Sequence, residues 1–150
     1  MTSAAGVLGE RFDHAWLAAW SRVLLGTLAV VRGRLEEARA LLDEGLELSL
    51  AAHSTRSVTL CLTAFAQLAF VEGDGERAAL VAGATESLRR RVGLRALILL
   101  RQGEAELVDQ IRQTLGADRF DQAFAAGAQL TQQEVVDVVR GRPGAGTRAS

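Results

Sequence analysis

The sequence predicts an all-α fold, and its composition, its spacing of glycines and an internal repeat support this. Of its 150 residues, 49% are hydrophobic, one is proline and none is tyrosine. Alanine, leucine, arginine and glutamate dominate, and these side chains lose little rotamer freedom on a helix. Glycines and capping residues divide the chain into segments of helical length. We therefore expect about seven helices, near residues 12–31, 35–52, 55–72, 75–91, 95–115, 118–127 and 131–140.

The first three segments differ in how much of their surface is apolar. Trp16 and Trp20 lie one turn apart on the first, where they either pack on the next helix or stay exposed for a partner or a neighbouring repeat. The second segment carries its apolar residues on one stripe and its acidic residues elsewhere. The third is apolar on most of its circumference from 58 to 71, which predicts a central core helix. Its polar residues there are Thr59, Thr63 and Gln67.

The later segments have recognisable ends. Asp74 follows a glycine at the start of the fourth segment and is a candidate N-cap. In the fifth, residues 97–115 repeat apolar side chains at three- and four-residue steps, so one face is expected to be buried. Thr131 and Glu134 have the spacing of a capping box, in which each side chain bonds the other residue's backbone N–H. A valine-rich helix is therefore predicted to begin at residue 131.

An internal repeat relates residues 28–38 to residues 68–78 at a constant offset of 40. Each copy has an apolar helix end, a glycine (Gly33 or Gly73) and an alanine five residues later. Glycine ends a helix well because it tolerates a left-handed backbone. The small alanine lets the second helix approach the first. Such hairpins cannot bury their apolar faces alone, so they are expected to stack on each other.

The spacing of these small and apolar residues resembles the tetratricopeptide (TPR) repeat. Arg22 and Leu62 stand where the repeat usually has tryptophan, and the offset of 40 exceeds the usual period of about 34. The resemblance implies antiparallel hairpins stacked as a fragment of a right-handed solenoid, with a groove lined by the first helix of each hairpin. Arg22 and Gln67 lie on those helices and are candidate partner contacts. The matching positions are Leu25, Gly26, Gly33, Ala38 and Leu42, then Phe65, Ala66, Gly73, Ala78 and Ala82.

Residues 78–89 and 115–136 resemble part of the multidomain regulators of actinobacteria. In those proteins a signal-transduction ATPase is followed by a TPR-like helical region and often by a LuxR-type DNA-binding domain. The resemblance implies that this chain is the non-catalytic sensor or scaffold part of an ATP-dependent transcriptional regulator. Its partners would then be a protein or peptide, or other domains of the regulator. The sequence shows no nucleotide-binding or helix-turn-helix element typical of that family.

The balance of charge and the single cysteine bear on partners and location. Seventeen arginines, with no lysine, face 18 acidic residues, for a formal net charge of −1. This argues against direct nucleic-acid or membrane-surface binding, which favours a basic surplus. Cys61 alone cannot form an internal disulfide, and residues 1–11 lack the order of a secretory signal. We expect one cytoplasmic domain over residues 12–140, with a flexible segment 1–11 and a disordered tail 141–150.

Residues that could carry chemistry are few. His14, His53 and Cys61 are the only soft metal ligands, and no two share the spacing that would place them on one helix face. Cys61 lies in the most apolar segment and is expected to be buried rather than nucleophilic. Residues 73–77 are rich in glycine, but a phosphate-binding P-loop needs a lysine, which the chain lacks. We therefore expect no enzyme activity, no metal and no cofactor.

Three alternatives remain open for binding. Arg89, Arg90, Arg91 and Arg95 could bind an anion or acidic partner, although arginines at a helix C-terminus also complement the helix dipole. Trp16 and Trp20 could instead mediate self-association, giving a homodimer. The third alternative is a helical bundle that binds a small ligand between the third and fifth helices, near Cys61 and Gln67.

Overall fold

The computed structural model describes residues 4–95 and 98–141, with side chains from residue 16 onward except at residue 99. This part of the chain contains seven helices and no strand, which confirms the all-α prediction. The helices are α1 (Ala4–Val31), α2 (Leu35–Ala51), α3 (Thr55–Val71), α4 (Gly75–Arg91), α5 (Ile98–Leu115), α6 (Ala117–Ala128) and α7 (Gln132–Val139).

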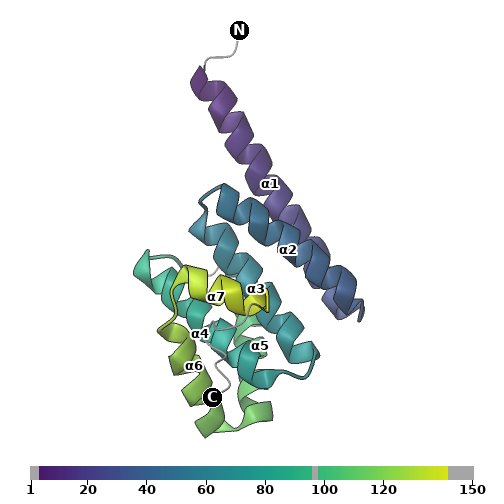
Figure 1. Cartoon of the computed structure of the whole chain (residues 1–150), viewed down its shortest axis with the longest axis vertical. Coiled ribbons are helices and arrows are strands. Elements are labelled where there is room, and N and C mark those ends of the chain that lie inside the picture. The colour runs from purple at the N-terminus through teal and green to yellow at the C-terminus, as the bar shows by residue number, and fades with distance from the viewer. Residues whose placement is uncertain (1–3, 96–97, 142–150) are drawn as a thin grey trace.

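The predicted bounds agree with these helices to within three residues, except at the start of α1. Residues 4–11, expected to be a flexible segment, form the first turns of α1. This stretch contains no proline, and its two glycines weaken a helix without ending it. As a result α1 projects beyond the other helices at its N-terminal end (Figure 1). The predicted tail lies outside the described residues except for Gly141.

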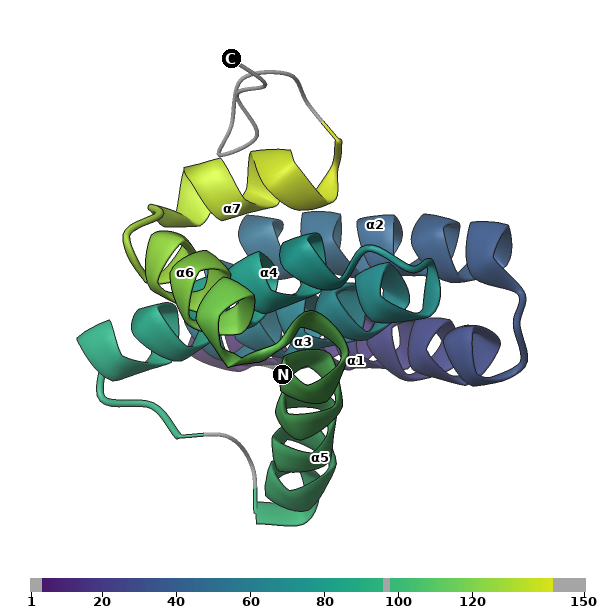
Figure 2. The same ribbon diagram turned by 90° about the horizontal axis from the view of Figure 1, so that it is seen from below.

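The first four helices form two antiparallel hairpins that pack side by side. Helix α1 contacts α2 and α3, α2 contacts α3, and α3 contacts α4. Helix α6 packs along α4, and α7 also contacts α4. Helix α5 does not continue the stack. It runs across the direction of the other helices, on the opposite side of the stack from α7 (Figure 2).

The repeated glycines occupy equivalent turns. Gly33 lies in the turn between α1 and α2 with φ +76°, and Gly73 lies in the turn between α3 and α4 with φ +88°. In each turn the residue after glycine donates its N–H five residues back, from Arg34 to Ala29 and from Asp74 to Ala69, both at 2.9 Å. Both glycines therefore stand at bends between helices, as the sequence predicts.

Helix α3 is the centre of the core, as predicted. Its residues Val58, Cys61, Leu62 and Leu68 are buried to 1% exposure or less. They share one hydrophobic cluster with side chains from α1, α2, α4 and α7. Burying so much apolar surface on both sides of one helix is the main stabilising contribution to a stack of this kind.

Helix α7 closes the stack at the end of the described chain. Thr131 and Glu134 form the predicted capping box, with N–H to side-chain oxygen distances of 3.0 and 3.1 Å. Four buried valines face the core: Val135, Val136, Val138 and Val139. Arg77 of α4 donates to the carbonyl of Val138, and Arg140 forms an ion pair with Glu47 of α2. These polar contacts fix α7 against both α4 and α2.

The carboxylate of Asp43 on α2 is in an unfavourable environment. Its Oδ1 atom is buried without a hydrogen-bond partner. Burial raises the pKa of Asp43 above its ordinary 3.8, although Arg39 and Arg140 oppose the shift. A carboxyl group whose pKa is raised by folding stabilises the native state when protonated, and this contribution is lost as the pH rises through the raised pKa.

The Asp43→Asn variant is therefore expected to be more stable than the wild type at neutral pH, because the amide carries no buried charge. The advantage should shrink as the pH falls through the raised pKa of Asp43 and disappear below the unfolded-state value of 3.8. Urea unfolding of both proteins from pH 3 to pH 8 measures it. A pH-independent difference would show that ionisation of Asp43 is not the cause.

Candidate functional site

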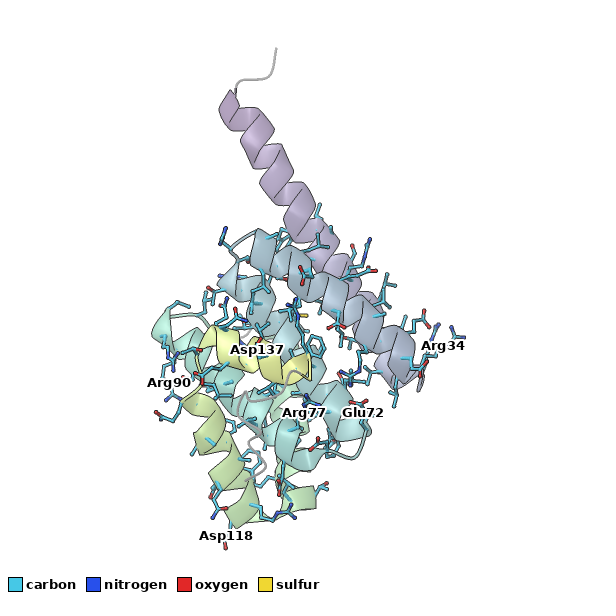
Figure 3. The ribbon with its side chains drawn as sticks, viewed as in Figure 1. Arg34, Glu72, Arg77, Arg90, Asp118 and Asp137 are labelled. Carbon is cyan, nitrogen blue, oxygen red and sulfur yellow. The ribbon has the colours of Figure 1, made fainter. Side chains whose placement is uncertain are left out.

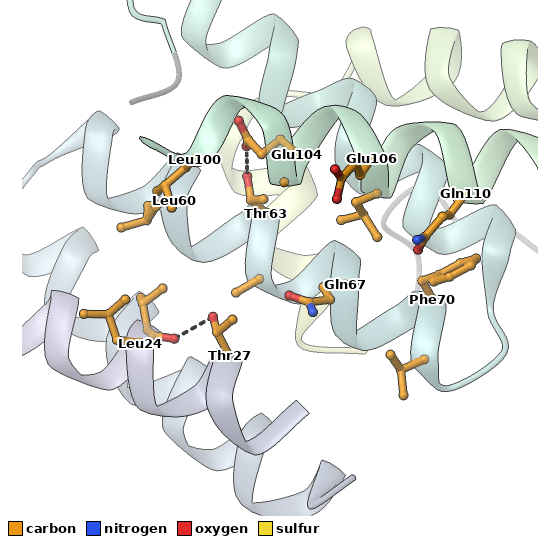
Figure 4. Close-up of a pocket in the computed structure, with 15 residues that line it drawn as sticks. Leu24, Thr27, Leu60, Thr63, Gln67, Phe70, Leu100, Glu104, Glu106 and Gln110 are labelled. Atoms are coloured by element: carbon orange, nitrogen blue, oxygen red, sulfur yellow. Dashed lines mark hydrogen bonds between the residues drawn. The ribbon is translucent and has the colours of Figure 1, made fainter. Parts of the chain in front are cut away.

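A groove with a volume of about 480 Å³ lies between α1, α3 and α5 (Figure 4). Most of its surface is apolar. Helix α1 contributes Val23, Leu24 and Thr27, helix α3 contributes Leu60, Thr63, Ala64, Gln67, Phe70 and Val71, and helix α5 contributes Leu100, Gly103, Glu104, Glu106, Leu107 and Gln110.

The groove exists because α5 leaves the direction of the stack. Helices α1 and α3 are the first helices of the two hairpins and lie side by side. A parallel fifth helix would cover α3, but α5 crosses it and touches α3 over a short length only. Leu107 packs against the core and holds the crossing point, while Leu100 at the start of α5 is exposed. The predicted apolar stripe of this segment is therefore buried over only part of its length.

Two amide side chains in the groove are available to a ligand. Gln67 extends from α3 into the space between α1 and α5, and Gln110 lies on α5 near Phe70 (Figure 4). Neither forms a hydrogen bond with the described residues. Thr27, by contrast, donates to the carbonyl of Val23 at 2.8 Å. An amide offers both donors and an acceptor, so these two groups can orient a polar part of a bound segment.

A buried polar network forms one wall of the groove. Arg89 of α4 donates to both oxygens of Glu104 on α5, at 2.7 and 3.1 Å. Thr63 of α3 donates to the same carboxylate at 2.6 Å. The side chains of Arg89 and Glu104 are 11% and 18% exposed. Because the network joins three helices, it holds α5 in its crossing position.

The two residues predicted to line a groove do not lie together. Gln67 lines the groove, whereas Arg22 is outside it and forms an ion pair with Glu44 of α2 at 3.0 Å. Glu106 and Gln110 also line the groove but were not predicted from the sequence, because periodicity along α5 does not reveal which helix it crosses. Their polar character beside an apolar stripe is the only signal in the sequence.

The four arginines predicted to form an anion patch are dispersed. Arg89 is buried against Glu104, and Arg90 pairs with Glu86 at 3.2 Å at the outer edge of the molecule (Figure 3). Arg91 donates to a backbone carbonyl, that of Ala128, at 3.2 Å. Among the described residues only Arg95 of the four has no such partner. Arg89 and Arg95 line one cleft, and Arg90 and Arg91 line another.

The two tryptophans contact each other on α1, with ring centroids 4.6 Å apart. Both are partly buried and lie outside the groove. The side chains at the exposed outer face of α1 are aliphatic instead. Its members are Leu17, Leu24, Leu25, Leu28 and Val31, each between 45% and 69% exposed.

Cys61 lies behind the groove rather than in it. The thiol is buried and donates to the carbonyl of Leu42 at 3.3 Å. Burial raises the pKa of the Cys61 thiol far above its ordinary value, which disfavours the reactive thiolate. The small-ligand alternative placed a pocket near both Cys61 and Gln67, and the groove contains only Gln67.

In the described part of the chain no three histidine, cysteine or acidic residues cluster as metal ligands would.

No family model, curated protein or solved structure matches the chain. The described residues include no helix with the length and hydropathy that crossing a membrane requires.

Proposed function

We propose that the chain is a non-catalytic protein-interaction domain that binds a segment of a partner in the groove between α1, α3 and α5. The groove itself carries this proposal. Its volume of about 480 Å³ falls within the range of ligand sites, and its apolar lining with a few polar groups is typical of them. The resemblance to the helical region of ATP-dependent transcriptional regulators supports a sensor or scaffold role of this kind.

The lining defines the segment that would bind. Leu24, Phe70 and Leu107 favour apolar side chains, as in grooves that accept an amphipathic helix. Gln67 and Gln110 favour a hydrogen-bonding group beside them. Among the described residues the groove lining contains the carboxylates of Glu104 and Glu106 and no basic side chain, so a positively charged residue at the edge of the segment is compatible with it. In a regulator, such a segment would come from another domain or from a separate protein.

The Gln67→Trp variant is expected to lose partner binding, because the indole ring would occupy the groove. Gln122→Trp on the exposed face of α6 is the matched control. Peptides selected on the wild-type chain from a library of helical sequences should bind the control with unchanged affinity and Gln67→Trp at least tenfold more weakly. Fluorescence anisotropy measures this. Peptides that bind all three proteins equally would place the interaction elsewhere.

A second candidate function is self-association through the outer face of α1. Leu17, Leu24 and Val31 recur every seven residues on this exposed face, opposite the buried Ala19, Val23 and Val30. A helix seam with this spacing is typical of helix pairing. The first turns of α1 project beyond the rest of the structure, where a second copy could reach them (Figure 1).

A Leu17→Glu/Leu28→Glu variant is expected to be monomeric at concentrations where the wild type dimerises, because like charges would face each other across the seam. Sedimentation velocity measures the assembly size. Val92→Glu, at an equally exposed position away from α1, is the control and should still dimerise. Only very weak dimers are fully dissociated at about 100 µM. A wild-type chain that is monomeric at this concentration would exclude this candidate.

A further inference from the structure

A second, smaller cleft lies beside the groove, where α1, α3 and the end of α4 meet the start of α5. Trp20, Arg56, Thr59 and Arg95 line it together with apolar side chains. Its interior volume is about 20 Å³, which is room for one oxygen-sized atom. A larger group could therefore place only one of its atoms in the interior. Its other atoms would contact the residues at the mouth of the cleft.

Three of the polar side chains that line this cleft, Trp20, Arg56 and Arg95, are donors with no acceptor among the described residues. The indole N–H of Trp20 is buried and has no hydrogen-bond partner. The guanidinium groups of Arg56 and Arg95 are exposed and form no ion pair with the described residues. Arg89 also reaches the cleft, but Glu104 already occupies it. The Thr59 hydroxyl donates to the carbonyl of Arg56 at 3.0 Å.

We propose that this cleft binds an oxoanion, either a carboxylate or a phosphate group. One oxygen would fill the interior and, once the indole ring turns enough to uncover its buried N–H, accept that hydrogen from Trp20, which can only donate. The remaining oxygens would lie at the mouth, where Arg56 and Arg95 provide charge-assisted hydrogen bonds. This site is distinct from the groove and does not depend on the function proposed for it.

Trp20 itself can report binding. The chain has two tryptophans and no tyrosine, so a Trp16→Phe variant leaves Trp20 as the only strong fluorophore. This variant is titrated with sodium phosphate, sodium acetate and sodium chloride at constant ionic strength. We expect a saturable change in Trp20 emission with phosphate or acetate and none with chloride. The anion that saturates at the lower concentration identifies which of the two groups the cleft prefers.

Variants test whether the named residues bind the anion. In the Trp16→Phe background, Arg56→Ala/Arg95→Ala should weaken binding at least tenfold. Arg32 is an exposed arginine in the turn after α1, and Arg32→Ala should leave binding unchanged. Trp20→Phe retains the ring and removes the N–H, and calorimetry should show weaker binding to it. Circular dichroism confirms that each variant is folded.

Three results would overturn the proposal. The first is the absence of a saturable change with either oxoanion. The second is an equal change with chloride, which would show general screening of charge. The third is equal affinity of the wild-type and Arg56→Ala/Arg95→Ala cleft, which would place the anion elsewhere.

Discussion

Replacing Gly127 by alanine is expected to lower the free energy of unfolding by about 3 kcal/mol, at the upper end of the usual cost of overpacking. A Cβ atom on Gly127 would stand 1.9 Å from the carbonyl oxygen of Leu80 on the facing helix. Real Cβ atoms do not approach an oxygen so closely, so α4 and α6 would have to separate.

The contact is reciprocal, which makes relief difficult. A Cβ atom on Gly83 of α4 would stand 2.0 Å from the carbonyl oxygen of Phe124 on α6. Both obstacles are backbone atoms, and no change of side-chain rotamer removes them. Separation of the helices would also loosen Phe120, which is buried at the same interface. Gly83→Ala is therefore expected to have a similar effect to Gly127→Ala.

Gly103→Ala is the matched control for this prediction. Gly103 is an exposed residue within α5, and a Cβ atom there would meet nothing within 4 Å. Alanine should stabilise the protein by about 0.5–1 kcal/mol, because glycine loses more backbone entropy in a helix. Urea unfolding monitored by circular dichroism measures all three variants. If Gly127→Ala proved as stable as Gly103→Ala, the close crossing of α4 and α6 would be wrong.

The helices themselves could be predicted because their signals are local. Gly33 and Gly73 end helices through their own backbone freedom, and Asp74 caps the next helix by accepting the N–H of Arg77 at 3.1 Å. Thr131 and Glu134 form the predicted capping box in the same way. Each of these interactions is complete within five residues of sequence, so the pattern alone determines it.

The path of α5 could not be predicted, because it depends on contacts between distant residues. Thr63 and Glu104 are 41 residues apart, and the sequence around each of them does not indicate that the two side chains form a hydrogen bond. The apolar stripe of α5 predicts a buried face but not the helix it packs on. Gln67 could be predicted because it lies on the first helix of a repeated hairpin, whereas Gln110 lies on α5, outside the repeat. The close approach of α4 and α6 at Gly83 and Gly127 could not be predicted either, because in the sequence both glycines are ordinary small residues within a helix.

The Arg89→Met variant is expected to lower the free energy of unfolding by about 3–5 kcal/mol, the usual cost of breaking a buried ion pair from one side. Methionine keeps most of the volume of arginine but leaves the carboxylate of Glu104 in a site where its side chain is only 18% exposed. Thr63 alone cannot compensate for the lost bidentate bond. Urea unfolding measures the loss, with Arg90→Met as the control. Arg90 pairs with Glu86 at the surface, where such pairs contribute about 0–1 kcal/mol.

A double variant, Arg89→Met/Glu104→Met, distinguishes the loss of the ion pair from the cost of leaving the Glu104 carboxylate buried without a partner. It should recover much of the stability lost in Arg89→Met, since two apolar side chains leave no unpaired charge. Hydrogen exchange adds a local readout, because the Arg89→Met substitution should deprotect the amides of α5 before those of α3. A groove that needs α5 in place should then also lose its peptide affinity in Arg89→Met and regain part of it in the double variant. Uniform deprotection of α3 and α5 would instead show that the network stabilises the whole stack and does not position α5.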